Sequence, residues 1–120
     1  MKTATLRNLA RTLFWPAVIV TIVGAVIPPA TLNGIVPWDK AGHFLAFYAL
    51  TLLGVAAFPR QPGVVIGAAL SLFGALIEVV QSTPLVHRDG DWHDWVADTV
   101  AILAVLVPMA LMRWRSTHAD

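Results

Sequence analysis

The sequence predicts an all-α fold, a single domain over residues 1–120 that forms an integral membrane four-helix bundle. The first observation is composition, because 58% of the residues are hydrophobic and 12% are charged, with a mean hydropathy of +0.72. Soluble domains keep about a quarter of their residues charged. The second observation is four apolar stretches of roughly 15–21 residues, close to the roughly 20 that cross the hydrocarbon core. Backbone in lipid must satisfy its own hydrogen bonds, which favours helices.

The first apolar stretch, with a predicted span of 13–28, follows a segment that contains Lys2, Arg7 and Arg11 and no acid. A secretory signal peptide has a similar pattern. No small-x-small cleavage site follows, so we favour a retained membrane helix. We expect Pro16 in its first turn or two, where a missing N–H costs least.

Two further spans are predicted at 41–58 and 64–82. The second helix follows a loop rich in Pro and Gly, and Asp39 suits its N-cap or first turn. In the third, small residues recur every four positions and allow close helix packing; they are Gly63, Gly67, Ser71 and Ala75. The fourth span is predicted at 92–112, with Pro108 kinking its last turns.

Basic residues are divided unequally between the two sides of such a bundle. Lys40 and Arg88 fall on one side, and six fall on the other: Lys2, Arg7, Arg11, Arg60, Arg113 and Arg115. The positive-inside rule then puts both termini in the cytoplasm, as in a multi-pass protein of the cell inner (plasma) membrane. The tryptophans lie near predicted helix ends, as interfacial anchors do; they are Trp15, Trp38, Trp92, Trp95 and Trp114.

This topology gathers the remaining polar residues at the outer side of the bundle. They lie at the start of the second helix, at the end of the third, and at the start of the fourth. In the fourth helix, Asp91, Asp94 and Asp98 are three and four residues apart and therefore share one helical face. The set is Asp39, Lys40, His43, Glu78, Gln81, Arg88, Asp91, Asp94 and Asp98. An ionised Asp in mid-membrane costs about 2.5–3.5 kcal/mol, so such residues indicate function by default. The alternative is a structural cluster that fixes helix packing, and first-turn acids also complement the helix dipole.

Other kinds of chemistry find little support. With a formal net charge of +1 and no basic patch interleaved with aromatics, we expect no nucleic-acid partner. The chain has no cysteine, which excludes disulfides and thiolate chemistry. His43, Glu78 and Asp98 form a conceivable metal-ligand set. No tight ligand motif, phosphate loop or nucleophile elbow is present, so we predict no metal and no cofactor.

The order and spacing of the polar residues resemble the VanZ-like family, small bacterial membrane proteins named for a teicoplanin-resistance determinant. The resemblance covers roughly residues 35–105 and depends on Asp39-Lys40 with His43, Glu78-x-x-Gln81, and Arg88 with Asp94. Two positions depart from the pattern, because Asp98 stands where the family usually has Asn and Ala101 where it often has Gly.

The resemblance implies an envelope protein that acts at the outer leaflet on lipids, lipid-linked precursors or surface polymers, and in some cases lowers teicoplanin sensitivity. We therefore expect membrane lipids or lipid-linked envelope precursors as partners. His43, Glu78 and Asp94 are the acid–base candidates. Lys40 and Arg88 would hold a phosphate, and the other candidates for headgroup binding are Asp39, Gln81, Asp91 and Asp98.

Whether the protein is an enzyme stays open at this point. The alternative is a non-enzymatic membrane scaffold or partner-binding protein whose polar cluster is structural. A proton or ion pathway is less favoured, because the predicted cytoplasmic halves contain little polar beyond Thr21, Thr51 and Ser71.

Overall fold

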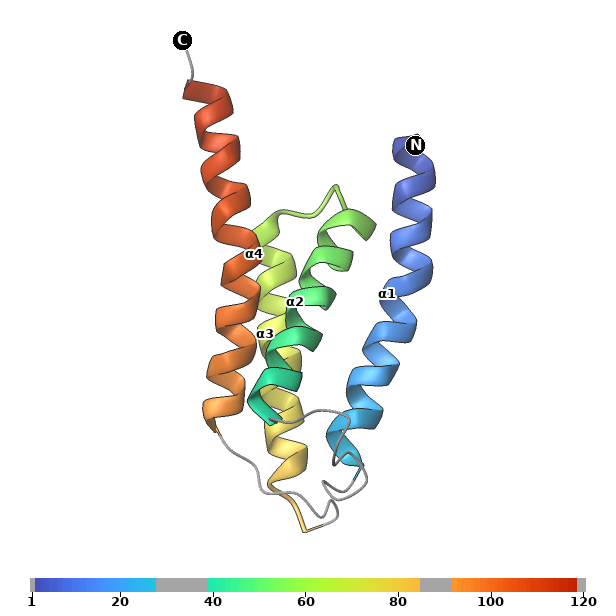
Figure 1. The fold of residues 1–120 in the computed structure, drawn as a ribbon, viewed down its shortest axis with the longest axis vertical. Helices are drawn as coiled ribbons and strands as arrows, with labels where there is room; N and C mark the ends of the chain where they lie inside the picture. Colours follow the sequence, from blue (N-terminus) through green and yellow to red (C-terminus); the bar gives the residue numbers. More distant parts are fainter. Residues whose placement is uncertain (1, 28–38, 85–91, 119–120) are drawn as a thin grey trace.

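The computed structural model describes residues 2–27, 39–84 and 92–118, with Asp39 and Lys40 described by their backbone alone. These residues form four α-helices and no strand (Figure 1): α1 (Thr3–Val26), α2 (Asp39–Ala57), α3 (Gly63–Gln81) and α4 (Trp92–His118). The predicted all-α four-helix bundle is confirmed.

Helix α2 lies between α1 and α4 and packs against both, while α4 also packs along α3 (Figure 1). Among the described residues, α1 and α4 make no contact with each other. The start of α1, the turn between α2 and α3, and the end of α4 lie at one end of the bundle, the upper end in Figure 1. We call this the terminal end. The other four helix ends lie together at the opposite end.

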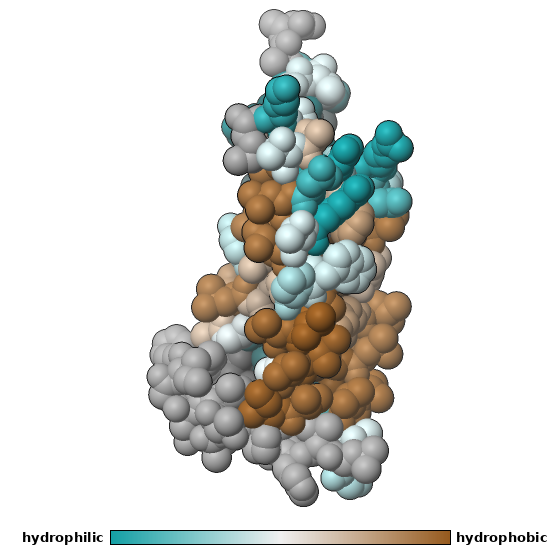
Figure 2. Space-filling model, turned by 90° about the vertical axis from the view of Figure 1, so that its right-hand side faces the viewer, coloured by the Kyte–Doolittle hydropathy of each residue, from teal (hydrophilic) through white to brown (hydrophobic). Residues whose placement is uncertain are grey.

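The bundle has an apolar outer surface and a partly polar interior. Large apolar side chains on every helix are exposed, for example Val20 by 70%, Leu45 by 65%, Val64 by 75% and Met112 by 69%. Figure 2 shows apolar side chains gathered over the middle and lower right of the face that it presents, beneath more hydrophilic ones. Soluble monomers rarely expose contiguous apolar patches larger than a few hundred Å². A surface of this kind is suited to lipid.

Three helices are long and apolar enough to cross a membrane: α1, α3 and α4. The apolar part of α2 is shorter, Ala41–Ala57. Together with the apolar surface, these helices make the chain a membrane protein.

Two prolines lie deeper in their helices than the sequence predicted. Helix α1 begins at Thr3, well before the predicted start of the span, so Pro16 lies in its interior and not in its first turns. Helix α4 continues to His118, which puts Pro108 well before its end. The predicted boundaries followed the apolar run, whereas a helix continues into the polar flank wherever good helix formers extend it. Membrane helices tolerate such prolines because neighbouring groups satisfy the freed carbonyls.

Small residues bring α3 close to α4, as predicted. A Cβ at Gly67 would lie 2.6 Å from Leu106 Cδ1, and one at Gly63 would lie 3.4 Å from Leu106 Cδ2. Further along, the Ser71 and Thr99 hydroxyls lie 3.1 Å apart. A further close approach is at Gly74, three residues after Ser71 and next to Ala75, the residue that the repeat of four singled out. Because an α-helix has 3.6 residues per turn, residues that recur every four positions move gradually around the helix, away from the face that contacts α4. A step of three, from Ser71 to Gly74, returns to that face.

Candidate functional site

Four ionisable side chains from three helices meet at the end of the bundle opposite the terminal end. We call His43, Glu78, Asp94 and Asp98 the polar cluster. His43 lies one turn into α2, Glu78 lies in the last turn of α3, and the two aspartates lie in the first two turns of α4. All four are buried, with exposed fractions of 9%, 8%, 2% and 0% in chain order.

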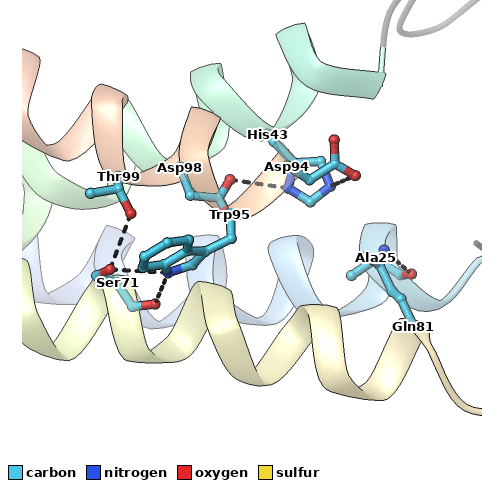
Figure 3. Close-up of polar contacts among 8 residues, drawn as sticks. All are labelled: Ala25, His43, Ser71, Gln81, Asp94, Trp95, Asp98 and Thr99. Carbon is cyan, nitrogen blue, oxygen red and sulfur yellow. Dashed lines mark hydrogen bonds and ion pairs between the residues drawn. The ribbon is translucent and has the colours of Figure 1, made fainter. Parts of the chain in front are cut away.

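The His43 imidazole lies between the two aspartates of α4 (Figure 3). Its Nδ1 is 3.0 Å from Asp98 Oδ1, a hydrogen-bond distance, and its Nε2 is 3.9 Å from Asp94 Oδ2. Asp94 and Asp98 are four residues apart and therefore project from one face of α4. A protonated His43 would donate from Nδ1 to Asp98 and present a second N–H toward Asp94.

Glu78 brings the third helix into the polar cluster. One of its carboxylate oxygens, a His43 ring nitrogen and an Asp94 carboxylate oxygen all lie within 4.8 Å of one another. The described part of the cluster therefore combines one imidazole with three carboxyl groups. Such a group can exchange protons and can bind hydroxyl, amine or other cationic groups.

Gly74 makes the space that Asp98 occupies. A Cβ at this position would lie 2.7 Å from Asp98 Oδ2, closer than real Cβ contacts allow. Sequence reasoning singled out the neighbouring Ala75 and missed Gly74. A signal was present, because glycine inside a helix costs roughly 1 kcal/mol relative to alanine, and Gly74 lies one turn before Glu78 on the same face.

The other predicted site residues have different surroundings. Gln81 is 1% exposed, and its Nε2 donates a hydrogen bond to Ala25 O at 2.9 Å, which joins α3 to the last turn of α1 (Figure 3). Its role as a headgroup ligand stays a prediction. Arg88 and Asp91 lie outside the described residues, as do the side chains of Asp39 and Lys40.

Trp95 has a role beyond the predicted interfacial anchor. Its indole Nε1 donates to Ser71 O at 3.1 Å and lies 3.2 Å from Ser71 Oγ (Figure 3). Ser71 also contacts Thr99. These contacts join α4 to α3 beside the polar cluster, since Trp95 directly follows Asp94 in the chain and Thr99 directly follows Asp98. They restrict how α4 can rotate about its axis.

The chemistry of the polar cluster also bears on metal binding, for which the sequence predicted no site. His43, Glu78 and Asp94 offer an imidazole nitrogen and two carboxylate oxygens, a ligand set that divalent metals accept. These ligand atoms all lie within 4.8 Å of one another, and ligands on a tetrahedral zinc lie about 3.4 Å apart, given bonds of about 2.1 Å. The absence of a metal stays a prediction, which elemental analysis of the purified protein can test.

The fold and the polar cluster define a class: a helical membrane protein with a histidine–carboxylate cluster buried at one end. No family model, no curated protein and no solved structure matches the chain. The resemblance to the VanZ-like family is therefore carried by the quoted residues alone.

Proposed function

We propose that the chain is a VanZ-like, multi-pass protein of the plasma (inner) membrane, with both termini in the cytoplasm. In this topology the polar cluster faces the outer leaflet, where it binds or modifies the polar headgroup of a lipid or lipid-linked envelope precursor. The consequence for the cell is lower sensitivity to teicoplanin-type glycopeptides. Support for the orientation comes from the six basic residues that the sequence assigns to the cytoplasmic side, against two on the other.

One observation carries the proposal: His43 lies between Asp94 and Asp98, with Glu78 beside it, inside a bundle whose outer surface is apolar. Burying ionisable groups costs several kcal/mol per ion. Well-packed apolar residues would hold helices together at lower cost. A function that requires these ionisable groups accounts for their presence despite this cost.

The geometry suits acid–base work on a headgroup. Asp98 holds Nδ1 of His43 and orients the ring, while Nε2 points toward Asp94. A histidine base whose ring is oriented by a hydrogen bond to a carboxylate is a recurrent arrangement in proton transfer. Lys40 and Arg88 would supply the positive charge for a phosphate, and Glu78 and Asp94 would accept hydrogen bonds from headgroup hydroxyl or amine groups.

The test compares two substitutions on one face of α4. Asp94→Asn removes a charge beside His43 Nε2, whereas Asp98→Asn keeps an oxygen that accepts from Nδ1 and introduces the residue usual in the family pattern. We expect Asp94→Asn and Glu78→Gln to abolish the change in teicoplanin sensitivity at normal membrane abundance, and Asp98→Asn to retain it. Lipid mass spectrometry of cells with and without the protein, and native mass spectrometry of bound lipid, identify the headgroup. No lipid change and no bound lipid would reject the proposal.

A membrane scaffold is the second candidate, and the burial of Asp98 favours it. Asp98 is 0% exposed and packs against Gly74, so part of the cluster is enclosed between helices. In a scaffold, the cluster would set helix register, and its variants would lose abundance and function together. Normal abundance of Asp94→Asn and Glu78→Gln with loss of function excludes this alternative.

A further inference from the structure

The terminal end carries a second concentration of charge, well separated from the polar cluster. A cavity of about 350 Å³ lies there, between the first turns of α1 and the turn that joins α2 to α3. Its lining residues are Arg7, Arg11, Phe58, Pro59, Arg60 and Gln61. Half of them are arginines, and none of these described residues is acidic. We call this cavity the arginine pocket.

The arginines converge because of helix periodicity and the α2–α3 turn. Arg7 and Arg11 are four residues apart on α1 and share one face, and Arg60 follows the end of α2. Arg11 is fixed on this face, since its Nε donates to Ala57 O at 2.8 Å and its guanidinium lies 5.6 Å from the centre of the Phe58 ring. The pocket therefore has a defined shape and does not depend on mobile side chains alone.

Arg7 shows that the pocket is electrostatically incomplete. Its Nε is buried and has no hydrogen-bond partner among the described residues. A buried donor without an acceptor destabilises the folded protein, and three guanidinium groups around one cavity repel one another. An anion in the pocket would supply the acceptor and neutralise the repulsion.

The pocket has an apolar side as well. Phe58 lines the pocket, and the rings of Phe14, Trp15 and Phe58 pack edge to face, with centroids 5.1–6.3 Å apart. Of these three residues, Trp15 is of a type enriched at the membrane–water interface. Figure 2 shows strongly hydrophilic side chains gathered toward the upper part of its face, over an apolar surface. A cavity that is lined by arginines and bordered by an aromatic ring is suited to an anion at the membrane surface.

We propose that the arginine pocket binds a phosphate group, carried by an anionic phospholipid of the leaflet at the terminal end or by a soluble phosphate. Planar guanidinium groups pair with phosphate oxygens in bidentate fashion, which distinguishes such a site from a diffuse positive surface. This site lies at the end of the bundle away from the polar cluster and is independent of the function proposed for that cluster.

The experiment compares two double variants that remove equal charge from the same end of the full-length protein. Arg7→Gln/Arg60→Gln empties the pocket of two guanidinium groups and leaves Arg11 to hold Ala57 O. Arg113→Gln/Arg115→Gln removes two exposed arginines from α4 that do not line the pocket. In neutral detergent, native mass spectrometry measures binding of phosphatidylglycerol, and a thermal-shift titration measures binding of inorganic phosphate.

We expect the pocket variant to lose roughly tenfold or more in affinity, the scale of one lost charge-assisted pair, and the α4 variant to lose less than about twofold. If only the pocket variant loses affinity, and only for phosphatidylglycerol, the site binds a lipid headgroup. If the pocket variant loses affinity for inorganic phosphate, the site binds a soluble ligand. Equal losses in both variants, or no binding of either probe by the wild-type protein, overturn the proposal. If the double variant does not fold, Arg60→Gln alone, in the exposed turn, serves in its place.

Discussion

The two ends of this bundle both gather ionisable side chains, but they treat them in opposite ways. In the polar cluster, Asp94 and Asp98 are 2% and 0% exposed and contact a histidine from another helix. At the terminal end, Arg11 and Arg60 are exposed and line a cavity. Buried charges depend on their partners, because removing one partner leaves the other uncompensated, whereas exposed charges are solvated and screened. Removing a whole side chain should therefore destabilise the protein more at the first end than at the second.

The largest difference is expected between His43→Ala and Arg60→Ala. Removing the imidazole leaves the carboxylates of Asp94 and Asp98 buried without it, which should cost about 3–5 kcal/mol of unfolding free energy. Removing the exposed Arg60 should change it by less than about 0.5 kcal/mol. Reversible unfolding in mixed detergent and SDS micelles measures both, and similar values for the two variants would contradict the distinction between the ends.

A smaller but still clear effect is expected at Gly74. Its Cβ would lie 2.7 Å from Asp98 Oδ2, so Gly74→Ala should cost about 1–3 kcal/mol through overpacking and displacement of that carboxylate. Gly24→Ala in α1 is the matched control, because nothing lies within 4 Å of its Cβ, and alanine there should be neutral or stabilising by up to about 1 kcal/mol. If both variants keep wild-type stability, the close approach of α3 to Asp98 is wrong.

The next pair compares two side chains that join neighbouring helices through a backbone carbonyl at opposite ends of the bundle. Gln81 donates to Ala25 O in a buried position, and Arg11 donates to Ala57 O in a partly buried one. Gln81→Met should cost about 1–3 kcal/mol, because the buried carbonyl loses its donor. Arg11→Met should cost about 0.5–1 kcal/mol, since water can replace the guanidinium. The same unfolding assay ranks them, and a reversed order would indicate that water reaches Gln81.

The smallest effect distinguishes two tryptophans. Trp95→Phe loses the hydrogen bond from the indole to Ser71 O and should cost about 0.5–1.5 kcal/mol. Trp114, which is 59% exposed and stacks on His118 near the end of α4, makes a contact within its own helix, so Trp114→Phe should be close to neutral. Equal, near-zero changes would reduce Trp95 to the interfacial anchor that the sequence predicted.

Much of the site could be anticipated without the structure. Four of the nine predicted site residues, those of the polar cluster, lie together in the structure. Gln81 is hydrogen-bonded to α1 instead, and the side chains of the other four lie outside the described residues. The reason is that an antiparallel connection brings the end of one helix beside the start of the next, and residues four apart share a face. Whether these residues act on a headgroup stays a prediction.

Other features of the site could not be predicted from the sequence, because they depend on the rotation of each helix about its axis and on its position along its neighbours. The close approach at Gly74, the hydrogen bond from Gln81 to α1 and the contact of Trp95 with Ser71 all require a particular pairing of positions on different helices. The arginine pocket likewise needs α1 and the α2–α3 turn side by side, although Arg7 and Arg60 are far apart in sequence. No local pattern encodes such pairings, because they result from side-chain packing across the whole bundle.

The sequence by itself determined that this protein is a helical bundle with an apolar exterior, and it indicated which polar residues would have to be accommodated at one end. Hydrophobic length and helical periodicity are local properties, and they suffice for that. Only the tertiary structure decided that His43 lies between Asp94 and Asp98, that Gly74 makes the space for Asp98, and that three arginines surround a cavity at the terminal end. Those arrangements are fixed by contacts between helices, where a shift of one residue in register changes every partner.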